Sequence, residues 1–330
     1  MKVKNLANTS DTFDFEFPPK PYDIVGFGSN SADQLCVVPE YPSSDSKTEI
    51  LQYERLPGGQ VATAAIFLAH MGLKARYIGK LGGDEAGRLM LQSFRSEDID
   101  ISNVIVEEKA LNNYAIIIID KSTGGRTIFC RRDELLDFRD SELREEDVCA
   151  GRILHIDGYD PLSLKAANWC RERGIAVSAD LDKVVPGCKE LLTKVDFLIA
   201  SADFPAKLTG ISDPEKSFVA LKGSFDGFLA VTLGAEGAMA WVGGRCVVFP
   251  GLKVKAVDTT GAGDIFHGGF LYGLLRNWPL RKIMAFANAA AGLSCGFLGA
   301  RTGIRPLPEI LCHADRLLGA GAGGGSDASV

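Results

Sequence analysis

The stretch Asp258-Thr-Thr-Gly-Ala-Gly-Asp264 decides how this chain is interpreted, because small residues stand directly before a carboxylate and an apolar run. Upstream of it, residues 246–249 read Cys-Val-Val-Phe, a pattern typical of a strand. Downstream, apolar side chains recur at nearly helical spacing, at Phe266, Phe270, Leu271, Leu274 and Leu275. The sequence therefore predicts a loop that joins a strand to a helix N-terminus.

Such a loop is suited to binding an anion. The first N–H groups of a helix lack partners, and the helix dipole is positive at that end. We expect the backbone of Gly261, Ala262 and Gly263 to approach phosphate oxygens, and Asp264 to accept the proton of an attacking hydroxyl. The alternative is structural: two turn glycines and an aspartate that caps the helix.

A second glycine pair precedes another predicted helix. Gly58 and Gly59 lead into residues 60–71, a good helix former that Gly72 closes. Residues 77–87 then read as a strand that runs into a further glycine turn.

The two segments, together with Gly268-Gly269-Phe270, resemble the signatures of the PfkB, or ribokinase-like, carbohydrate kinase family. The resemblance covers residues 22 to about 312. It implies a three-layer α/β sandwich with a mainly parallel sheet and a small β-sheet lid over the sugar. It also implies an ATP-dependent sugar kinase, a phosphotransferase with an alcohol acceptor, that uses ATP and Mg²⁺, with K⁺ as a candidate activator.

The pattern along the chain agrees with this α/β fold, because apolar strand candidates alternate with amphipathic helical runs. We expect one kinase domain over 22–318, an N-terminal extension over 1–21 and a disordered tail over 319–330. Strands are predicted at 24–27, 75–78, 153–156, 176–179, 197–200 and 228–233. Lid strands are expected near 34–38, 48–55 and 113–133, the last a hairpin across residues 122–125.

Composition supports a globular protein that binds small molecules. The 330 residues are 46% hydrophobic and 24% charged, with a net charge of -6, so a nucleic-acid surface is not expected. No signal peptide and no membrane-spanning run are recognised. The eight cysteines are scattered without zinc-type spacing, so we expect reduced thiols and a cytoplasmic location.

The residues expected to bind the acceptor lie beyond the first strand and around the glycine pair. By resemblance, Asp33 grips two sugar hydroxyls, a task suited to the two oxygens of a carboxylate; an Asx turn is the alternative. His155 is expected to be a buried structural histidine. The full set of candidate acceptor ligands is Ser31, Asp33, Gly58, Gly59, Gln60, Thr63 and Asp157.

Two further groups of residues follow from the resemblance. The ATP site is implied at Thr232, Gly234, Gly237 and Asn288, although a hairpin turn and a helix-surface amide explain the same residues. A monovalent-cation site is implied at Asp258 and Thr260 with backbone carbonyls from residues 294–303, among them those of Ser294 and Gly299. A homodimer through the lid is also implied.

Some positions depart from the family pattern. Thr63 stands where the family usually has Asn, and the common Asn-x-x-Glu element is replaced by Ser201-Ala-Asp-Phe204. The second change, together with Ser178-Ala-Asp-Leu-Asp-Lys183 and Gly125-Arg-Thr-Ile128, resembles the ketohexokinase-like branch more than ribokinase. The acceptor remains open between a ketohexose such as fructose and a ribose-like sugar. A phosphosugar or sulfosugar, gripped by Lys80, Arg126, Arg131 and Arg132, a nucleoside, and a non-catalytic sugar sensor are the alternatives.

Overall fold

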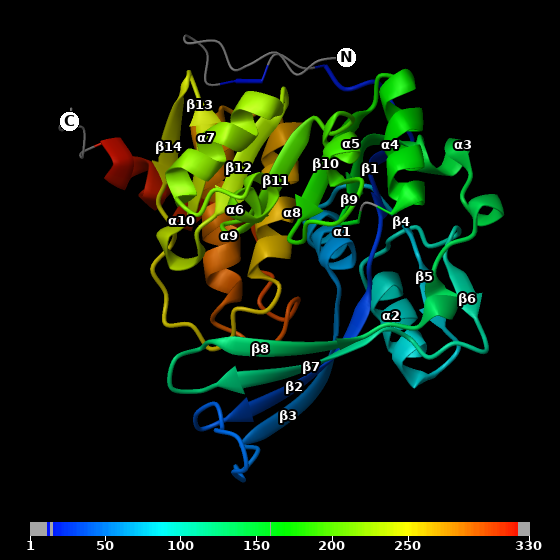
Figure 1. Cartoon of the computed structure of the whole chain (residues 1–330), viewed down its shortest axis with the longest axis vertical. Coiled ribbons are helices and arrows are strands. Elements are labelled where there is room, and N and C mark those ends of the chain that lie inside the picture. The colour runs from blue at the N-terminus through cyan, green and yellow to red at the C-terminus, as the bar shows by residue number, and fades with distance from the viewer. Residues whose placement is uncertain (1–11, 14–15, 159, 323–330) are drawn as a thin grey trace.

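A computed structural model describes residues 12–13, 16–158 and 160–322. Its centre is an eight-stranded sheet (Figure 1). Strands β12 to β14 pair antiparallel and the other neighbours pair parallel, so the predicted mainly parallel sheet is confirmed. In order across the sheet, the strands are β14 (Arg245–Phe249), β13 (Ala238–Val242), β12 (Phe228–Thr232), β11 (Phe197–Ser201), β10 (Ala176–Leu181), β9 (Gly151–Ile156), β1 (Tyr22–Phe27) and β4 (Ala75–Ile78).

Both faces of this sheet are covered by helices, which explains why its strands are almost continuously apolar. In β1, Ile24 packs into one core cluster and its neighbour Val25 into the other. The first cluster includes α1 (Gln60–His70), α2 (Glu85–Ser96), α8 (Ala262–Leu275), α9 (Leu280–Ser294) and α10 (Leu307–Ala322). The second includes α3 (Glu145–Val148), α4 (Pro161–Glu172), α5 (Cys188–Leu192), α6 (Phe204–Thr209) and α7 (Pro214–Ser224). In Figure 1, α6 and α7 lie in front of the sheet and α8 and α9 behind it.

A separate four-stranded sheet projects below the main body in Figure 1. Its order is β3 (Gln52–Gly58), β2 (Ser31–Val38), β7 (Tyr114–Asp120) and β8 (Arg126–Arg131). Strands β7 and β8 form the expected hairpin. The strand predicted over 48–55 instead begins at Gln52 and continues through Pro57, which is tolerated because β3 is an edge strand.

The two faces of this small sheet differ. One face carries Leu35, Ala115, Ile117 and Ile119, which form a third apolar cluster with Leu56 and Leu298. On the opposite face Ile116 and Phe129 are paired neighbours and are both exposed. A further two-stranded sheet pairs β5 (Lys80–Gly82) with β6 (Ile105–Glu107).

The ends of the chain depart from the expected boundaries. Phe13, inside the expected extension, is buried, and its ring contacts those of Phe197, Phe228 and Phe270 at centroid distances of 5.5, 5.2 and 6.2 Å. Helix α10 runs to Ala322, past the tail boundary expected at 319, and residues 323–330 lie outside the described part. Within the described part, no helix is long and apolar enough to span a bilayer.

Candidate active site

The predicted anion cradle lies at the N-terminus of α8, where the chain arrives from β14. Gly261 is the N-cap of this helix and has a φ of 75°, in the left-handed region. A Cβ atom on Gly261 would lie 2.4 Å from the Cβ of Ala300, so the position requires glycine. Gly263 is exposed with open space around its Cα, whereas the N–H of Ala262 donates to the carbonyl of Thr259 at 3.3 Å. The backbone of Gly263 is therefore the more accessible donor.

Asp264 stands in the first turn of α8, partly exposed to solvent. Burial raises the pKa of its carboxyl to about 7, and the nearby charge of Asp180 raises it further. Asp157 and Asp33 act in the same direction, while His267 lowers the pKa. A carboxyl that titrates near neutral pH is suited to receive a proton and to release it again.

Asp258 connects the cradle to the loop that follows α9. Its carboxylate accepts bonds from the N–H and hydroxyl of Thr260, at 2.9 and 2.7 Å, and from the N–H of Gly299 at 2.8 Å. Three of the four predicted cation ligands are thus brought together. The fourth, Ser294, was predicted to bind through its backbone carbonyl, which accepts from the N–H of Phe297 at 3.1 Å.

The glycine pair lies against Asp33 of the small sheet. A Cβ atom on Gly58 would be 2.0 Å from Oδ2 of Asp33, so the carboxylate occupies the space that a side chain would take. Gly59, with φ 92°, begins α1. Burial raises the pKa of Asp33 to about 6, although a hydrogen bond from Ser31 and the charge of Arg301 oppose this. The prediction that Asp33, Ser31, Gly58 and Gly59 share one site agrees with this geometry.

The other predicted acceptor ligands are engaged by protein groups. Gln60 hydrogen-bonds Asp180, and the fully buried Thr63 accepts from Arg301 at 3.2 Å. Asp157 accepts from the N–H of Ser29, at 3.1 and 3.0 Å, and from its hydroxyl. These contacts fix the positions of Gln60, Thr63 and Asp157 beside the glycine pair, and their contact with sugar stays a prediction.

The sequence did not predict a buried contact between a histidine and a carboxylate near Asp264. His267, one turn after Asp264 on α8, lies 3.2 Å from Asp180 of β10. His155 is buried, as predicted, and contacts Ser178 at 3.3 Å. The signal in the sequence was a histidine three residues after Asp264 in an otherwise apolar helix.

Arg301 was missed as well. It follows α9, and its guanidinium reaches α1, α2 and the end of β3. The signal in the sequence was a single arginine inside the small-residue run Gly299-Ala-Arg-Thr-Gly303.

The residues predicted to bind nucleotide converge on the end of β14. Thr232 ends β12, and the turn after it, with Gly234 and Gly237, packs on residues 249–251. Asn288 is buried and donates to the carbonyls of Phe249 and Pro250, at 3.0 and 3.1 Å. Its amide nitrogen therefore anchors the start of the loop that leads to the cradle.

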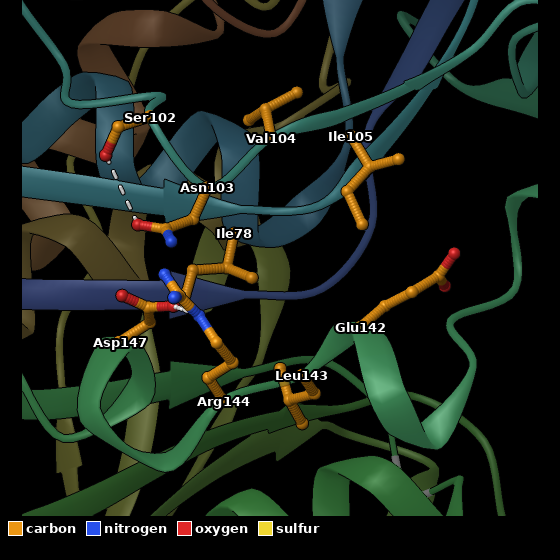
Figure 2. A pocket seen from close by; sticks show the side chains of 9 residues that line it. All are labelled: Ile78, Ser102, Asn103, Val104, Ile105, Glu142, Leu143, Arg144 and Asp147. Atoms are coloured by element: carbon orange, nitrogen blue, oxygen red, sulfur yellow. Dashed lines mark hydrogen bonds and ion pairs between the residues drawn. The ribbon is translucent and has the colours of Figure 1, made fainter.

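A pocket of about 190 Å³ lies elsewhere, between β6 and the segment before α3. None of the predicted site residues lines it. Figure 2 shows that its polar groups are turned toward one another: Arg144 pairs with Asp147 at 2.7 Å, and Ser102 donates to Asn103 at 3.3 Å. This pocket is therefore separate from the residues that the sequence singles out.

A carboxylate in the first turn of a helix, beside a loop suited to anions and within electrostatic reach of Asp33 on the small sheet, fits a phosphotransferase with a hydroxyl acceptor. The chain matches the family model described as pfkB family carbohydrate kinase over residues 23–306, and it belongs to that family. The predicted fold and the predicted class, an ATP-dependent sugar kinase, are therefore confirmed.

Known relatives cover most of the chain. It is 27% identical to a ribokinase of Haemophilus influenzae, over 87% of this chain and 97% of that protein. It is 28% identical to probable fructokinase-5 of Arabidopsis thaliana, over 82% and 90%. A solved structure of Arabidopsis thaliana ribokinase, complexed with ribose and ATP, superposes with a TM-score of 0.75 at 21% identity, covering 89% of this chain and 98% of that one.

Proposed function

We propose that this carbohydrate kinase transfers the γ-phosphate of ATP to a hydroxyl of a small neutral sugar, a ketohexose such as fructose or a ribose-like sugar. The observation that carries the proposal is the position of Asp264 in the first turn of α8, directly after the glycines of the anion cradle, where burial raises the pKa of its carboxyl to about 7. The ribokinase and fructokinase relatives support the acceptor class.

In the proposed reaction, Asp33 accepts hydrogen bonds from two sugar hydroxyls and thereby places a primary hydroxyl near Asp264. Asp264 takes the hydroxyl proton as the oxygen attacks the γ-phosphorus, and the bond from that phosphorus to the ADP oxygen breaks. Backbone N–H groups of Gly261 and Gly263 stabilise the charge that develops on the phosphoryl oxygens, with Ala262 completing the cradle.

Mg²⁺ fits this site as a companion of the nucleotide. Among the described residues, no group of three or more His, Cys, Asp or Glu side chains is arranged to hold a metal. Mg²⁺ needs few protein carboxylates when phosphate oxygens and water fill its coordination sphere, and it neutralises phosphate charge there. Asp203, from the substituted Asn-x-x-Glu element, pairs with Lys207 and is exposed.

The nucleotide itself is assigned to the turn of Thr232, Gly234 and Gly237, with Asn288 beside it. We propose this because Gly234 faces open space and the turn packs on residues that lead to the cradle. ATP bound there would direct its phosphates along the path from β14 to Gly261.

A neutral acceptor is favoured over an anionic one by the four basic side chains singled out in the sequence. Each is already engaged: Lys80 by Glu142 at 3.2 Å, Arg126 by Thr259 at 2.5 Å, Arg131 by Asp133 at 3.4 Å, and Arg132 by Asp137 at 3.8 Å. Lys80 in particular is buried and held away from solvent. A phosphate or sulfonate on the sugar would have to displace Glu142 from the buried Lys80, whereas the contacts of the three arginines are more exposed and compete only weakly.

The test is ATP consumption with Mg²⁺ across ketoses, aldoses, phosphosugars, sulfosugars and nucleosides. We expect turnover with a neutral ketose or pentose. Preference for a phosphosugar, a sulfosugar or a nucleoside would contradict the acceptor class, and no turnover with any of them would favour the non-catalytic sensor. Titrating K⁺ in the same assay tests the cation site at Asp258, Thr260, Ser294 and Gly299.

We also propose a homodimer through the outer face of the small sheet. Tyr53, Ile116 and Phe129 are exposed there, at 53%, 37% and 53%, and an exposed apolar strand surface favours association. Phe129→Glu is expected to yield a monomer in light scattering, whereas the control Val248→Glu, on strand β14, keeps the dimer. A wild-type monomer would contradict this proposal.

The eight free cysteines favour a reducing compartment, so we propose a cytoplasmic location. Fractionation of the expressing cells tests it, and recovery of the protein outside the cytoplasm would contradict it.

A further inference from the structure

The segment Leu298–Arg301, between α9 and α10, lies where three parts of the site meet. In Figure 1 the loop after α9 descends toward the small sheet. Leu298 packs against the apolar cluster of Leu35 and Ile117 on the inner face of that sheet. The N–H of Gly299 donates to the Asp258 carboxylate at 2.8 Å.

The next residue, Ala300, lies directly on the anion cradle. A Cβ on Gly261 would be 2.4 Å from the Cβ of Ala300 and 2.6 Å from its Cα. The backbone of Gly261 therefore lies so close to Ala300 that no side chain fits between them. Because packed protein interiors have little free volume, Gly261 cannot shift far toward this segment unless the segment shifts too.

Arg301 extends from the same segment to the acceptor side. Nη2 donates to the carbonyl of Gly58 at 2.5 Å, Nε to the hydroxyl of Thr63 at 3.2 Å, and Nη1 to the hydroxyl of Ser93 at 2.7 Å. Its guanidinium also lies 5.7 Å from the ring centroid of Phe94. One side chain thus holds the glycine pair, α1 and α2 together.

The charge of Arg301 is retained despite its surroundings. Burial lowers the pKa of Arg301 to about 10, while Asp33 and Asp264 oppose this shift. The guanidinium remains a cation at neutral pH and lies within electrostatic reach of both carboxylates that the reaction uses. A planar guanidinium with three fixed acceptors is a rigid link, which a lysine cannot reproduce.

We propose that Arg301 is a positioning residue that couples occupation of the acceptor pocket to the geometry of the anion cradle. This inference rests on the proposed function. A sugar bound by Asp33 and the glycine pair steadies the Gly58 carbonyl that Arg301 binds. Ala300, next to Arg301, contacts Gly261. Restricting the motion of Arg301 therefore also restricts the backbone N–H groups of the cradle that bind the phosphoryl group. The two substrates then bind cooperatively, as a coupling free energy between two sites.

The experiment measures this coupling by titration calorimetry. The Kd of the Mg²⁺ complex of the non-hydrolysable ATP analogue AMP-PNP is determined with and without saturating acceptor. D-fructose and D-ribose are the first probes. Sugar should tighten nucleotide binding by about fivefold or more in the wild type. In Arg301→Gln the effect should fall to less than about twofold, and Arg301→Lys should be intermediate because an ammonium keeps part of the contact.

Arg305→Gln is the matched control, because Arg305 lies four residues further on and pairs with Glu309 at 3.2 Å, away from the glycine pair. It should retain the wild-type coupling. If Arg301→Gln fails to fold, Ala300→Gly carries the test, since it removes the methyl group at Gly261 and leaves the guanidinium in place. It should weaken the coupling measurably.

Full coupling in Arg301→Gln, or in Ala300→Gly if the former does not fold, would overturn the inference. A wild type that binds both substrates without any coupling would also overturn it. Failure of the proposed function looks different: the wild type would then show coupled binding of sugar and nucleotide but would transfer no phosphate in the ATP-consumption assay.

Discussion

The anion cradle and the small sheet carry the two carboxylates of the site, but they hold them differently. Asp264 belongs to a helix whose surroundings are packed, charged groups, among them Asp180 and His267. Asp33 belongs to a sheet with one buried and one exposed apolar face. The difference suggests that the cradle supplies the chemistry, while the sheet supplies recognition and assembly. Substitutions at the two places should therefore change different kinetic constants.

The largest change in kinetics is expected from Asp264→Asn. If this variant changed sugar binding instead of turnover, the proposed division of roles between the cradle and the small sheet would be wrong. Turnover should fall by about 100-fold or more, because the general base is lost. The KM for sugar should change little. Steady-state kinetics on the identified acceptor provide the measurement, and normal turnover would show that Asp264 is not the base.

Asp264→Asn should not be less stable to unfolding than the wild type at pH 8. Since the folded-state pKa of Asp264 is raised to about 7, the stability it contributes is fully present below about pH 4 and is lost as pH rises through 7. A neutral Asn escapes this loss, so its Tm at pH 8 should equal or exceed that of the wild type. A clear decrease in Tm at pH 8 would contradict this reasoning.

An intermediate effect is expected from Asp33→Asn, on the recognition side. The KM for sugar should rise by about tenfold to a hundredfold, since a hydrogen bond to a charged group contributes about 1.5–3 kcal/mol. The kcat should fall less than the KM rises. Glu54→Gln, on the neighbouring strand and exposed, is the control. An equal loss of turnover in the Asp33 and Asp264 variants would contradict the assignment of recognition to the small sheet and of chemistry to the cradle.

The smallest expected effect is on the pH dependence of kcat/KM. It would test whether the groups around Asp264 set the pKa of that carboxyl. Asp264 is faced by Asp180, His267, Asp157, Asp33 and Arg301. Removing the negative charge in Asp180→Asn should lower the pKa of Asp264 and move the acid limb of kcat/KM to lower pH. His267→Gln should move it the opposite way. Each shift should amount to less than about one pH unit, or less than tenfold in rate at a given pH. Asp182→Asn, at an exposed position directly after β10, should leave the limb in place.

The sequence predicted the parts of this molecule whose signals are local. Six of the eight strands of the central sheet lie at the predicted apolar runs, and the helix before Gly72 ends there with a φ of 82° at that glycine. The motif from Asp258 to Asp264 identified the cradle because its residues are consecutive.

Other features depend on residues far apart in the chain, so no local pattern reveals them. Arg301 binds Gly58 across 243 positions, and Asp180 meets His267 only after α8 packs on the sheet. The β3 strand was misplaced because Pro57 argues against a strand until its edge position is known. The assigned roles of the site residues remain predictions that the experiments above address.

The buried ring of Phe13 bears on how this kinase is prepared for study. A gene shortened to begin at β1 would remove that ring and expose part of Phe197, Phe228 and Phe270 to water. The loss of hydrophobic stabilisation would be about 2 kcal/mol. Expression should therefore start upstream of residue 12, and an affinity tag is better joined there through a flexible spacer than fused directly to the first strand.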